Sequence, residues 1–260
     1  MYKITGNIVD AISEKIYPAE IIIKNGIIER IKKISKAENF IIPGFIDSHI
    51  HIESSLVSPE QFSIEAVKHG TVGVVSDPHE IANILGIDGI NYMIESSKKS
   101  SLKMFFGAPS CVPATNLDSS GAIINSNTVK ILMKRNDIYF LSEMMNFPGV
   151  IFGDKEVFKK IEYAKKNGNP IDGHAPGLTG EKLNKYIKSG ISTDHEVVTY
   201  NEALEKLKKG MIVQIREGSA VKSFDTLKLL IDKYPDQVML CSDDLHPDDL
   251  LKGHINSLVV

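Results

Sequence analysis

Two histidines two residues apart, His49 and His51, are the residues of this sequence best suited to bind a metal ion. They lie in the stretch PGFIDSHIHIES, directly after a short apolar run. Side chains at positions i and i+2 of a strand point to the same side, so both imidazoles can face one metal ion. Such a pair alone is more often structural than metal-binding, so the interpretation depends on the rest of the chain.

Further residues of metal-binding type follow other short apolar runs. Glu143 comes after YFL, His174 after PIDG, His195 after GISTD, and the pair Asp243 and Asp244 after QVMLCS. Histidine and carboxylate side chains bind zinc, iron(II) or manganese, and this set could fill two adjacent metal sites with a bridging group. Because these residue types recur at the ends of apolar runs, their placement is unlikely to be a chance feature of the sequence.

The apolar runs themselves are typical of buried parallel strands. FIIPGFID is continuously hydrophobic, as in a strand covered on both faces, and polar residues appear only at its C-terminal end, where catalytic groups of α/β barrels gather. The candidate strands are FIIPGFID, TVGVVSD, LKMFFGA, IYFLSE, PIDGH, GISTDH, MIVQIRE and QVMLCSD. Amphipathic stretches separate them, and three of these are expected to end at a left-handed glycine, at Gly168, Gly190 and Gly210. Eight strands alternating with helices predict an α/β fold, a (β/α)8 TIM-type barrel.

The first part of the chain has a different pattern of apolar residues. Residues 1–39 contain short β-type runs, with the pair Asn25 and Gly26 as the strongest hairpin turn of the sequence. We expect a small β-strand domain there, half of a β-sandwich, and a metal-dependent α/β barrel over residues 40–260. A length of 260 residues is enough for a barrel of about 250 residues.

Composition narrows the classes of partner. Hydrophobic content of 42%, charged content of 24% and a net charge of −3 are ordinary for a globular protein and give no signature of nucleic-acid binding. The sequence has no run of about 18 apolar residues and no basic-then-apolar leader, so we expect no membrane partner and a cytoplasmic location. Cys111 and Cys241 are too far apart for a metal-binding pair and are expected to be reduced.

Eight segments together resemble the adenine deaminases, a family within the amidohydrolase superfamily. They are HIHIESS, VSDPHEIANILG, APSCVPAT, LSEMMNFPGV, GHAPGL, STDHE, IREGS and CSDDLHP, and the resemblance covers essentially the whole chain. Superfamily members often bridge two metals with a carboxylated lysine on the fourth strand, whereas Glu143 stands there in this sequence, as it does in adenine deaminases. The resemblance implies a barrel enzyme that hydrolyses adenine to hypoxanthine and ammonia with a hydroxide held between two metal ions.

The resemblance also assigns roles residue by residue. His49, His51 and Asp243 match the ligands of the more buried metal, and Glu143 matches the bridging group. His174 and His195 match the ligands of the second metal. The two divalent ions are expected to be Mn²⁺ or Fe²⁺, with Zn²⁺ as an alternative.

Asp243 is the expected proton shuttle between the nucleophile, the ring nitrogen and the departing ammonia. As the last strand residue it is expected to face inward, whereas Asp244 is expected to turn toward the loop and cap the next helix.

Other polar residues at the predicted active face have open roles. Glu196, which follows a ligand histidine, could contact the purine ring as a catalytic group or orient that histidine. His79 and Glu80 follow the second strand and are candidates for substrate binding. Arg216 could orient the substrate or form a structural ion pair with a carboxylate such as Glu217, and the ion pair is the default interpretation.

The sequence departs from the family in length, because adenine deaminases are roughly twice as long. The chain ends at Val260, so we expect the last barrel helix and a C-terminal domain to be missing. Association into a homo-oligomer, or complementation by a second chain, would cover the surfaces left open. Two alternatives to adenine deamination remain: another amidohydrolase reaction, on a cyclic amide or a different purine, and a non-catalytic truncated fragment or subunit.

Overall fold

The computed structural model describes residues 1–115 and 117–259 of the chain. They form two compact units, Met1–Gly44 and Phe45–Val260, each with its own internal contacts. The first unit is a small sheet, and the second carries every residue singled out above as a metal ligand.

The first unit is one four-stranded sheet. Its strands are β1 (Tyr2–Asp10), β2 (Lys15–Lys24), β3 (Ile27–Lys33) and β4 (Phe40–Ile41), in the order β3-β2-β1-β4. The predicted hairpin joins β2 to β3, with positive φ angles of 52° at Asn25 and 76° at Gly26, as a two-residue turn between antiparallel strands requires. Every residue of the edge strand β3 is exposed.

The prediction of one continuous strand over FIIPGFID is wrong. The segment is divided into β4, which pairs with β1 of the small sheet, and β5 (Phe45–His51), which pairs with β6 (Thr71–Ser76) of the second unit. Pro43 lies between the two strands, and proline has no N–H to donate to a sheet ladder. Hydrophobic character alone did not reveal that the chain changes sheets at this proline.

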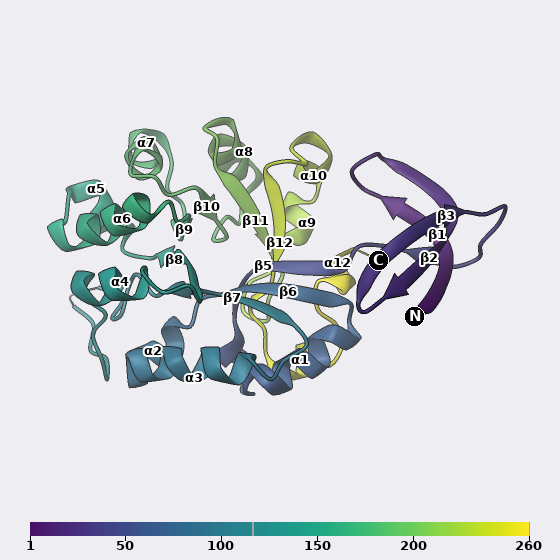
Figure 1. Cartoon of the computed structure of the whole chain (residues 1–260). Helices are drawn as coiled ribbons and strands as arrows, with labels where there is room; N and C mark the ends of the chain where they lie inside the picture. The colour runs from purple at the N-terminus through teal and green to yellow at the C-terminus, as the bar shows by residue number, and fades with distance from the viewer. Residues whose placement is uncertain (116, 260) are drawn as a thin grey trace. The chain divides into compact units, whose positions relative to one another are not determined.

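The second unit is built around parallel strands that follow one another in sequence order (Figure 1). The remaining strands are β7 (Lys103–Ala108), β8 (Ile138–Met144), β9 (Ile171–Gly173), β10 (Thr193–Asp194), β11 (Ile212–Arg216), β12 (Val238–Cys241) and β13 (Asp243–Asp244). The sheet from β5 to β9 is followed by β10, since the backbone N–H of Ser192 donates to the carbonyl of Ile171 at 3.2 Å.

The last strand returns to the first, because β13 pairs in parallel with β5 and places Asp243 opposite Ile50. The strands thus curl into a partial barrel. The predicted fold class, an α/β barrel with a small N-terminal β region, is confirmed.

Helices follow most of these strands. They are η1 (Ile52–Ser55), α1 (Pro59–Lys68), α2 (His79–Leu85), α3 (Ile87–Ser97), α4 (Ser126–Leu132), α5 (Phe147–Phe152), α6 (Lys155–Asn167), α7 (Gly180–Lys188), α8 (Tyr200–Lys208), α9 (Phe224–Leu227), α10 (Leu229–Lys233), α11 (Pro247–Leu250) and α12 (Asn256–Val259). Gly168, Gly190 and Gly210 have φ angles of 72°, 102° and 87°, so the expected left-handed glycines after α6, α7 and α8 are confirmed.

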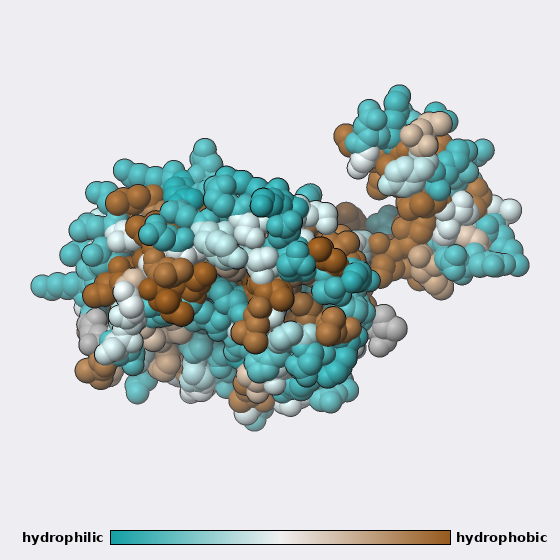
Figure 2. Space-filling view, turned by 90° about the horizontal axis from the view of Figure 1, so that it is seen from below, coloured by the Kyte–Doolittle hydropathy of each residue, from teal (hydrophilic) through white to brown (hydrophobic). Residues whose placement is uncertain are grey.

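The core lies between the strands and these helices. Phe62 of α1, Ile90 of α3 and Leu132 of α4 are almost completely buried. The face drawn in Figure 2 is mostly hydrophilic on the second unit, with hydrophobic groups set between polar ones. Within the described ranges, no helix combines the length and the apolar character needed to cross a lipid bilayer.

Candidate metal centre

His49 and His51 end strand β5 and point into the same buried space. Their Nε2 atoms are 3.2 Å apart, and both rings are almost fully buried. Asp243 of β13 joins them, with its Oδ1 3.4 Å from Nε2 of His49 and 2.9 Å from Nε2 of His51. These three residues are called the first ligand group. Pairing of β13 with β5 brings the group together from strands far apart in the sequence.

Hydrogen bonds at the Nδ1 atoms fix the ring orientations of His49 and His51. Nδ1 of His49 lies 2.7 Å from a carboxylate oxygen of Asp172, and Nδ1 of His51 lies 2.9 Å from the backbone carbonyl of Asp77. Because both partners are acceptors, each Nδ1 carries a proton and Nε2 of each ring faces inward. Two inward Nε2 atoms 3.2 Å apart, beside a carboxylate oxygen, are stabilised by positive charge between them, supplied by protons or by a metal ion. The donor set therefore fits a divalent metal ion.

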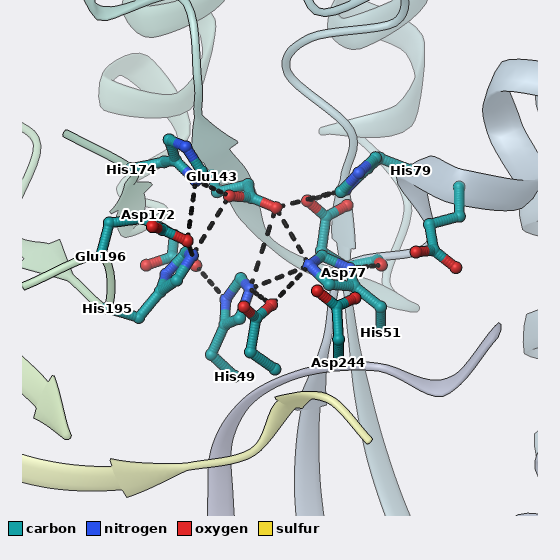
Figure 3. Close-up of polar contacts among 12 residues, drawn as sticks. His49, His51, Asp77, His79, Glu143, Asp172, His174, His195, Glu196 and Asp244 are labelled. Atoms are coloured by element: carbon teal, nitrogen blue, oxygen red, sulfur yellow. Dashed lines mark hydrogen bonds and ion pairs between the residues drawn. The ribbon is translucent and has the colours of Figure 1, made fainter. Parts of the chain in front are cut away.

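Glu143, at the end of β8, lies between two sets of histidines (Figure 3). Its Oε1 is 3.1 Å from Nε2 of His51, and its Oε2 is 2.6 Å from Nδ1 of His174 and 3.3 Å from Nε2 of His195. Each carboxylate oxygen thus faces a different histidine set. This is the arrangement of a carboxylate that can bridge two metal ions.

His174 and His195 follow β9 and β10 and are called the second ligand group. The Nδ1 atom of His195 is buried and has no hydrogen-bond partner among the described residues. His195 also stacks on His49, with ring centroids 3.9 Å apart, so the two ligand groups are in direct contact. The side chain of His174 is 25% exposed, whereas that of His51 is 4% exposed, which makes the second group the more open one.

Asp243 has an unusual backbone. Its φ angle is 58°, a left-handed conformation that is rare for a residue with a side chain and that often occurs at functional sites. Its Oδ2 is 2.5 Å from a guanidinium nitrogen of Arg216, so its two oxygens face a cation on one side and the histidines on the other. The same guanidinium contacts Glu196 and lies 3.2 Å from Asp244.

Two expectations about the charged neighbours are corrected here. Asp244 does not cap the next helix; it accepts a hydrogen bond from Ser54 at 2.8 Å and pairs with Arg216, because β13 pairing turns it toward η1. Arg216 does form an ion pair, as the default interpretation held, but its partners are Glu196, Asp243 and Asp244 rather than Glu217.

The protonation equilibria of the cluster favour charge. Burial alone would raise the pKa of Glu143, but hydrogen bonds from His174, His195 and His51 outweigh it and hold the pKa well below its ordinary value. Burial likewise opposes ionisation of Asp243, and contacts with His49 and His51 depress its pKa instead. Burial lowers the pKa of His51, yet the two carboxylates raise it well above the usual value. The ionised carboxylates in this buried space are balanced by positive charge, which protonated histidines supply and which a bound metal ion would supply in their place.

The remaining candidates line a cavity of about 170 Å³ above these ligands. His79 has its Nδ1 3.1 Å from Asp77 and 3.3 Å from Glu143, while Glu80 accepts a hydrogen bond from Ser54 at 3.0 Å. Glu196 also lines this cavity. Drug-sized ligands occupy about 300 to 1,000 Å³, so the cavity suits a smaller molecule. Every site residue expected from the sequence thus lies in or beside one cavity.

The residues that hold the candidate ligands in place were not predicted from the sequence. Asp172 stands two residues before His174, so the same-side spacing that drew attention to the histidine pair could have revealed it. Asp194 immediately precedes His195 and accepts the backbone N–H of Glu196 at 2.9 Å. Asp47, two residues before His49, accepts the backbone N–H of that histidine at 3.2 Å. Aspartates near ligand histidines were the available signal.

Comparison with known proteins agrees with this geometry. The sequence matches adenine deaminase of Methanosarcina mazei with 55% identity over 261 residues, which is 100% of this chain and 47% of that protein. It matches adenine deaminase of Parabacteroides distasonis with 52% identity, over 98% of this chain and 47% of that protein. The chain thus spans about half the length of the curated relatives it matches.

Solved structures resemble the fold at low sequence identity. D-hydantoinase from a Bacillus species superposes with a TM-score of 0.61 and 14% identity, covering 92% of this chain and 67% of that one. For 5-methylcytosine deaminase from Klebsiella pneumoniae the TM-score is 0.55 at 13% identity, covering 94% of this chain and 75% of that one. The profile described as "Amidohydrolase family" matches residues 40–256. On this match, the chain belongs to the amidohydrolase family.

Proposed function

We propose that the chain catalyses the hydrolytic deamination of adenine, in which adenine and water give hypoxanthine and ammonia. The observation that carries the proposal is Glu143, whose two oxygens face two different histidine sets. Identity of 55% to an adenine deaminase supports the choice of substrate. The small cavity above the ligands is consistent with a purine base.

The metal ligands of the proposal are the two groups described above. The first ligand group would hold one ion, the second ligand group would hold the other, and Glu143 faces both groups and could bind both ions. Mn²⁺ or Fe²⁺ is the proposed metal, because imidazole and carboxylate ligands suit both ions and the resemblance to adenine deaminases favours them. When bound, such a metal pair lowers the pKa of water, so that hydroxide is available near neutral pH.

Asp243 is the proposed proton carrier. Its Oδ1 lies among the ligand nitrogens and its Oδ2 is held by Arg216, so the carboxylate is fixed at the floor of the cavity. In the reaction, Asp243 takes one proton from the attacking water and delivers it to the ring nitrogen while the hydroxide adds to C6. It then takes the proton of the new C6 hydroxyl and delivers it to the exocyclic amino group, so that the C6 carbonyl forms as ammonia leaves. Cleavage of the bond between C6 and the exocyclic nitrogen then releases ammonia. Asp243 ends the cycle deprotonated.

Glu196 and Arg216 have supporting roles in the proposal. Arg216 is almost fully buried and holds Glu196, Asp243 and Asp244, so it fixes three carboxylates and is assigned to positioning. Glu196 remains partly exposed toward the cavity and is the proposed contact to the purine ring. His79 and Glu80 also line the cavity and complete the proposed substrate contacts.

The test is formation of hypoxanthine from adenine by the purified chain, reconstituted with Mn²⁺ or Fe²⁺ under reducing conditions. Guanine, cytosine and dihydroorotate are assayed in parallel, because related pockets on the same metal chemistry would act on those substrates. The proposal predicts turnover of adenine that disappears in Asp243→Asn. Turnover of another substrate in preference to adenine would refute the substrate assignment, and a folded, metal-loaded chain inactive on all four would refute catalysis by this chain.

The proposal includes self-association of the chain. Ile27, Ile28 and Ile31 of the edge strand β3 are 70%, 56% and 47% exposed, and an exposed apolar edge is prone to pair with another chain. Sedimentation analysis of the purified chain would measure the oligomeric state, and a monomer at all concentrations would refute this part.

A further inference from the structure

The second ligand group is held by side chains from α7, which follows His174, and from α8, which follows His195. His174 begins the loop after β9, and buried side chains of α7 and α8 reach that loop. Tyr186 of α7 and Lys206 of α8 are both completely buried. A buried ammonium group is costly unless it is fully paired, so the contacts of Lys206 define what it holds.

Lys206 joins the backbone after His174 to two carboxylates. Its Nζ donates to the carbonyl of Ala175 at 2.9 Å, to Asp194 at 2.6 Å and to Glu202 at 2.5 Å. Glu202 in turn accepts the backbone N–H of Gly177 at 2.9 Å. The loop that follows His174 is therefore fixed at two peptide groups by one ion-paired cluster.

The same cluster reaches the other ligand of the group. Asp194 immediately precedes His195, and its Oδ1 accepts the backbone N–H of Glu196 at 2.9 Å and that of Ala175 at 3.4 Å. One carboxylate thus binds the backbone on the far side of His195 and the backbone next to His174. Because Lys206 holds the other oxygen of Asp194, it orients both attachments.

Tyr186 provides an independent attachment on the other side. Its hydroxyl accepts the backbone N–H of His174 itself at 2.9 Å and donates to the carbonyl of Met144 at 3.1 Å. Met144 directly follows Glu143, so this hydroxyl joins a ligand histidine to the residue next to the bridging carboxylate. Tyr186 and Lys206 therefore hold the backbone on both sides of His174, at its own N–H and at the carbonyl of Ala175.

We propose that Lys206 and Tyr186 are positioning residues for the second metal site, and that they set the affinity of that site without comparable effect on the first. The inference rests on the proposed metal sites and not on adenine being the substrate. Groups that orient metal ligands typically contribute about 10- to 100-fold in metal affinity. The expected effect is thus selective loss of one of two ions.

The experiment measures bound Mn²⁺ per chain against free Mn²⁺, by equilibrium dialysis and elemental analysis. Wild type is expected to hold two ions, and Lys206→Met only one at concentrations that saturate wild type, with the weaker dissociation constant raised about 10- to 100-fold. Tyr186→Phe removes a single oxygen and retains the buried ring, so it provides the test if Lys206→Met fails to fold. Its expected effect is in the same direction.

Matched controls are present on α8 and at its C-terminal end. Lys209 forms the same type of ion pair four residues along, with Glu205 at 2.9 Å, and donates to a backbone carbonyl, that of Gly180, at 3.1 Å, but it touches neither ligand loop. Lys209→Met is expected to retain both ions. Tyr200→Phe, which removes an exposed hydroxyl that accepts from Lys233, is the control for Tyr186→Phe.

Double variants identify the affected site. In a His49→Ala background, which weakens the first site, Lys206→Met is expected to remove the remaining ion. In a His174→Ala background the second site is already empty, so Lys206→Met is expected to change metal content no further. Two ions bound with wild-type affinity in Lys206→Met and Tyr186→Phe would overturn the proposal, and so would parallel loss of both ions in a folded variant. Hypoxanthine formation plays no part in these outcomes, so a wrong substrate assignment leaves them readable.

Discussion

The two ligand groups of the candidate metal centre have the same type of support, but its residues come from different parts of the chain. Each has a buried aspartate just before a ligand histidine: Asp47 for the first group and Asp194 for the second. Each aspartate binds backbone N–H groups beside the ligands and is itself held by a buried basic side chain. The basic partner of Asp47 is His254, 207 residues away, whereas the partner of Asp194 is Lys206, only 12 residues away.

This difference in sequence separation indicates which contacts hold each ligand group in place. Asp47 accepts backbone N–H groups from His49 at 3.2 Å and from Ser242, the residue before Asp243, at 3.1 Å. The first group therefore exists only when the beginning and the end of the barrel meet. The second group, its aspartate and its lysine all lie between residues 171 and 210 and need only local strand and helix packing. Long-range closure orders one site and local contacts order the other.

Glu143→Ala is expected to have the largest effect on metal binding, because Glu143 is the residue that faces both ligand groups. Both ions are expected to be lost, with affinity for each reduced by more than about 100-fold, since even indirect support of ligands contributes about 10- to 100-fold. Elemental analysis after dialysis measures the content. If two ions per chain remain, Glu143 does not bridge the two ligand groups.

Comparing Asp243→Asn with Asp244→Asn distinguishes loss of the proposed proton carrier from loss of a neighbouring ion pair. Loss of the proton carrier is expected to lower turnover by about 10²- to 10⁴-fold. Asp244→Asn weakens a partly exposed ion pair with Arg216 and alters one hydrogen bond from Ser54, so it is expected to lower turnover by less than about tenfold. Steady-state rates of both variants, measured with fully metal-loaded protein, make the comparison. A larger loss in Asp244→Asn would transfer the proton-carrying role to Asp244.

His174→Ala tests whether the two ligand groups bind metal ions independently. The variant is expected to bind one ion instead of two, because the first ligand group lies on other strands and is almost fully buried. The greater exposure of His174 also predicts that a chelator removes one ion from wild type faster than the other. A stopped-flow chelation trace with one phase, or equal weakening of both sites in His174→Ala, would contradict the division into two ligand groups.

Asp47→Ala is the counterpart of Lys206→Met and has the smallest expected effect on metal binding. It removes the acceptor of His49, Ser242 and His254, so weakening of the first site by about 10- to 100-fold is expected. Unpaired buried donors are also expected to lower the free energy of unfolding by about 1 to 3 kcal/mol. Metal titration and thermal melting measure the two effects. Weakening confined to the second site would reverse the comparison.

The sequence identified the residues that the structure brings together in one cluster better than it identified the residues that support them. His49 and His51 stand out because strand spacing and residue type coincide, and Glu143, His174 and Asp243 each end an apolar run. Asp47 and Lys206 give no such signal, because a lone aspartate in a strand or a lysine on an amphipathic helix resembles many solvent-exposed residues. Their roles depend on which backbone groups the fold places beside them, and spacing alone does not contain that information.

The fold was predictable for a similar reason. Continuous apolar runs alternating with amphipathic stretches identify parallel strands and helices wherever both faces of the sheet are covered. The prediction was wrong at Pro43, where two strands of different sheets adjoin with no polar residue between them, and at Asp244, whose partner Arg216 lies on a neighbouring strand. Each error concerns a choice between partners that are distant in sequence.

The most direct test of the metal centre is an anomalous difference map at the manganese edge from crystals of the Mn²⁺-loaded chain. We expect two peaks, one among His49, His51 and Asp243 and one beside His174 and His195, with an oxygen of Glu143 facing each. A single peak, or peaks that leave Glu143 without a metal neighbour, would contradict the proposed metal centre.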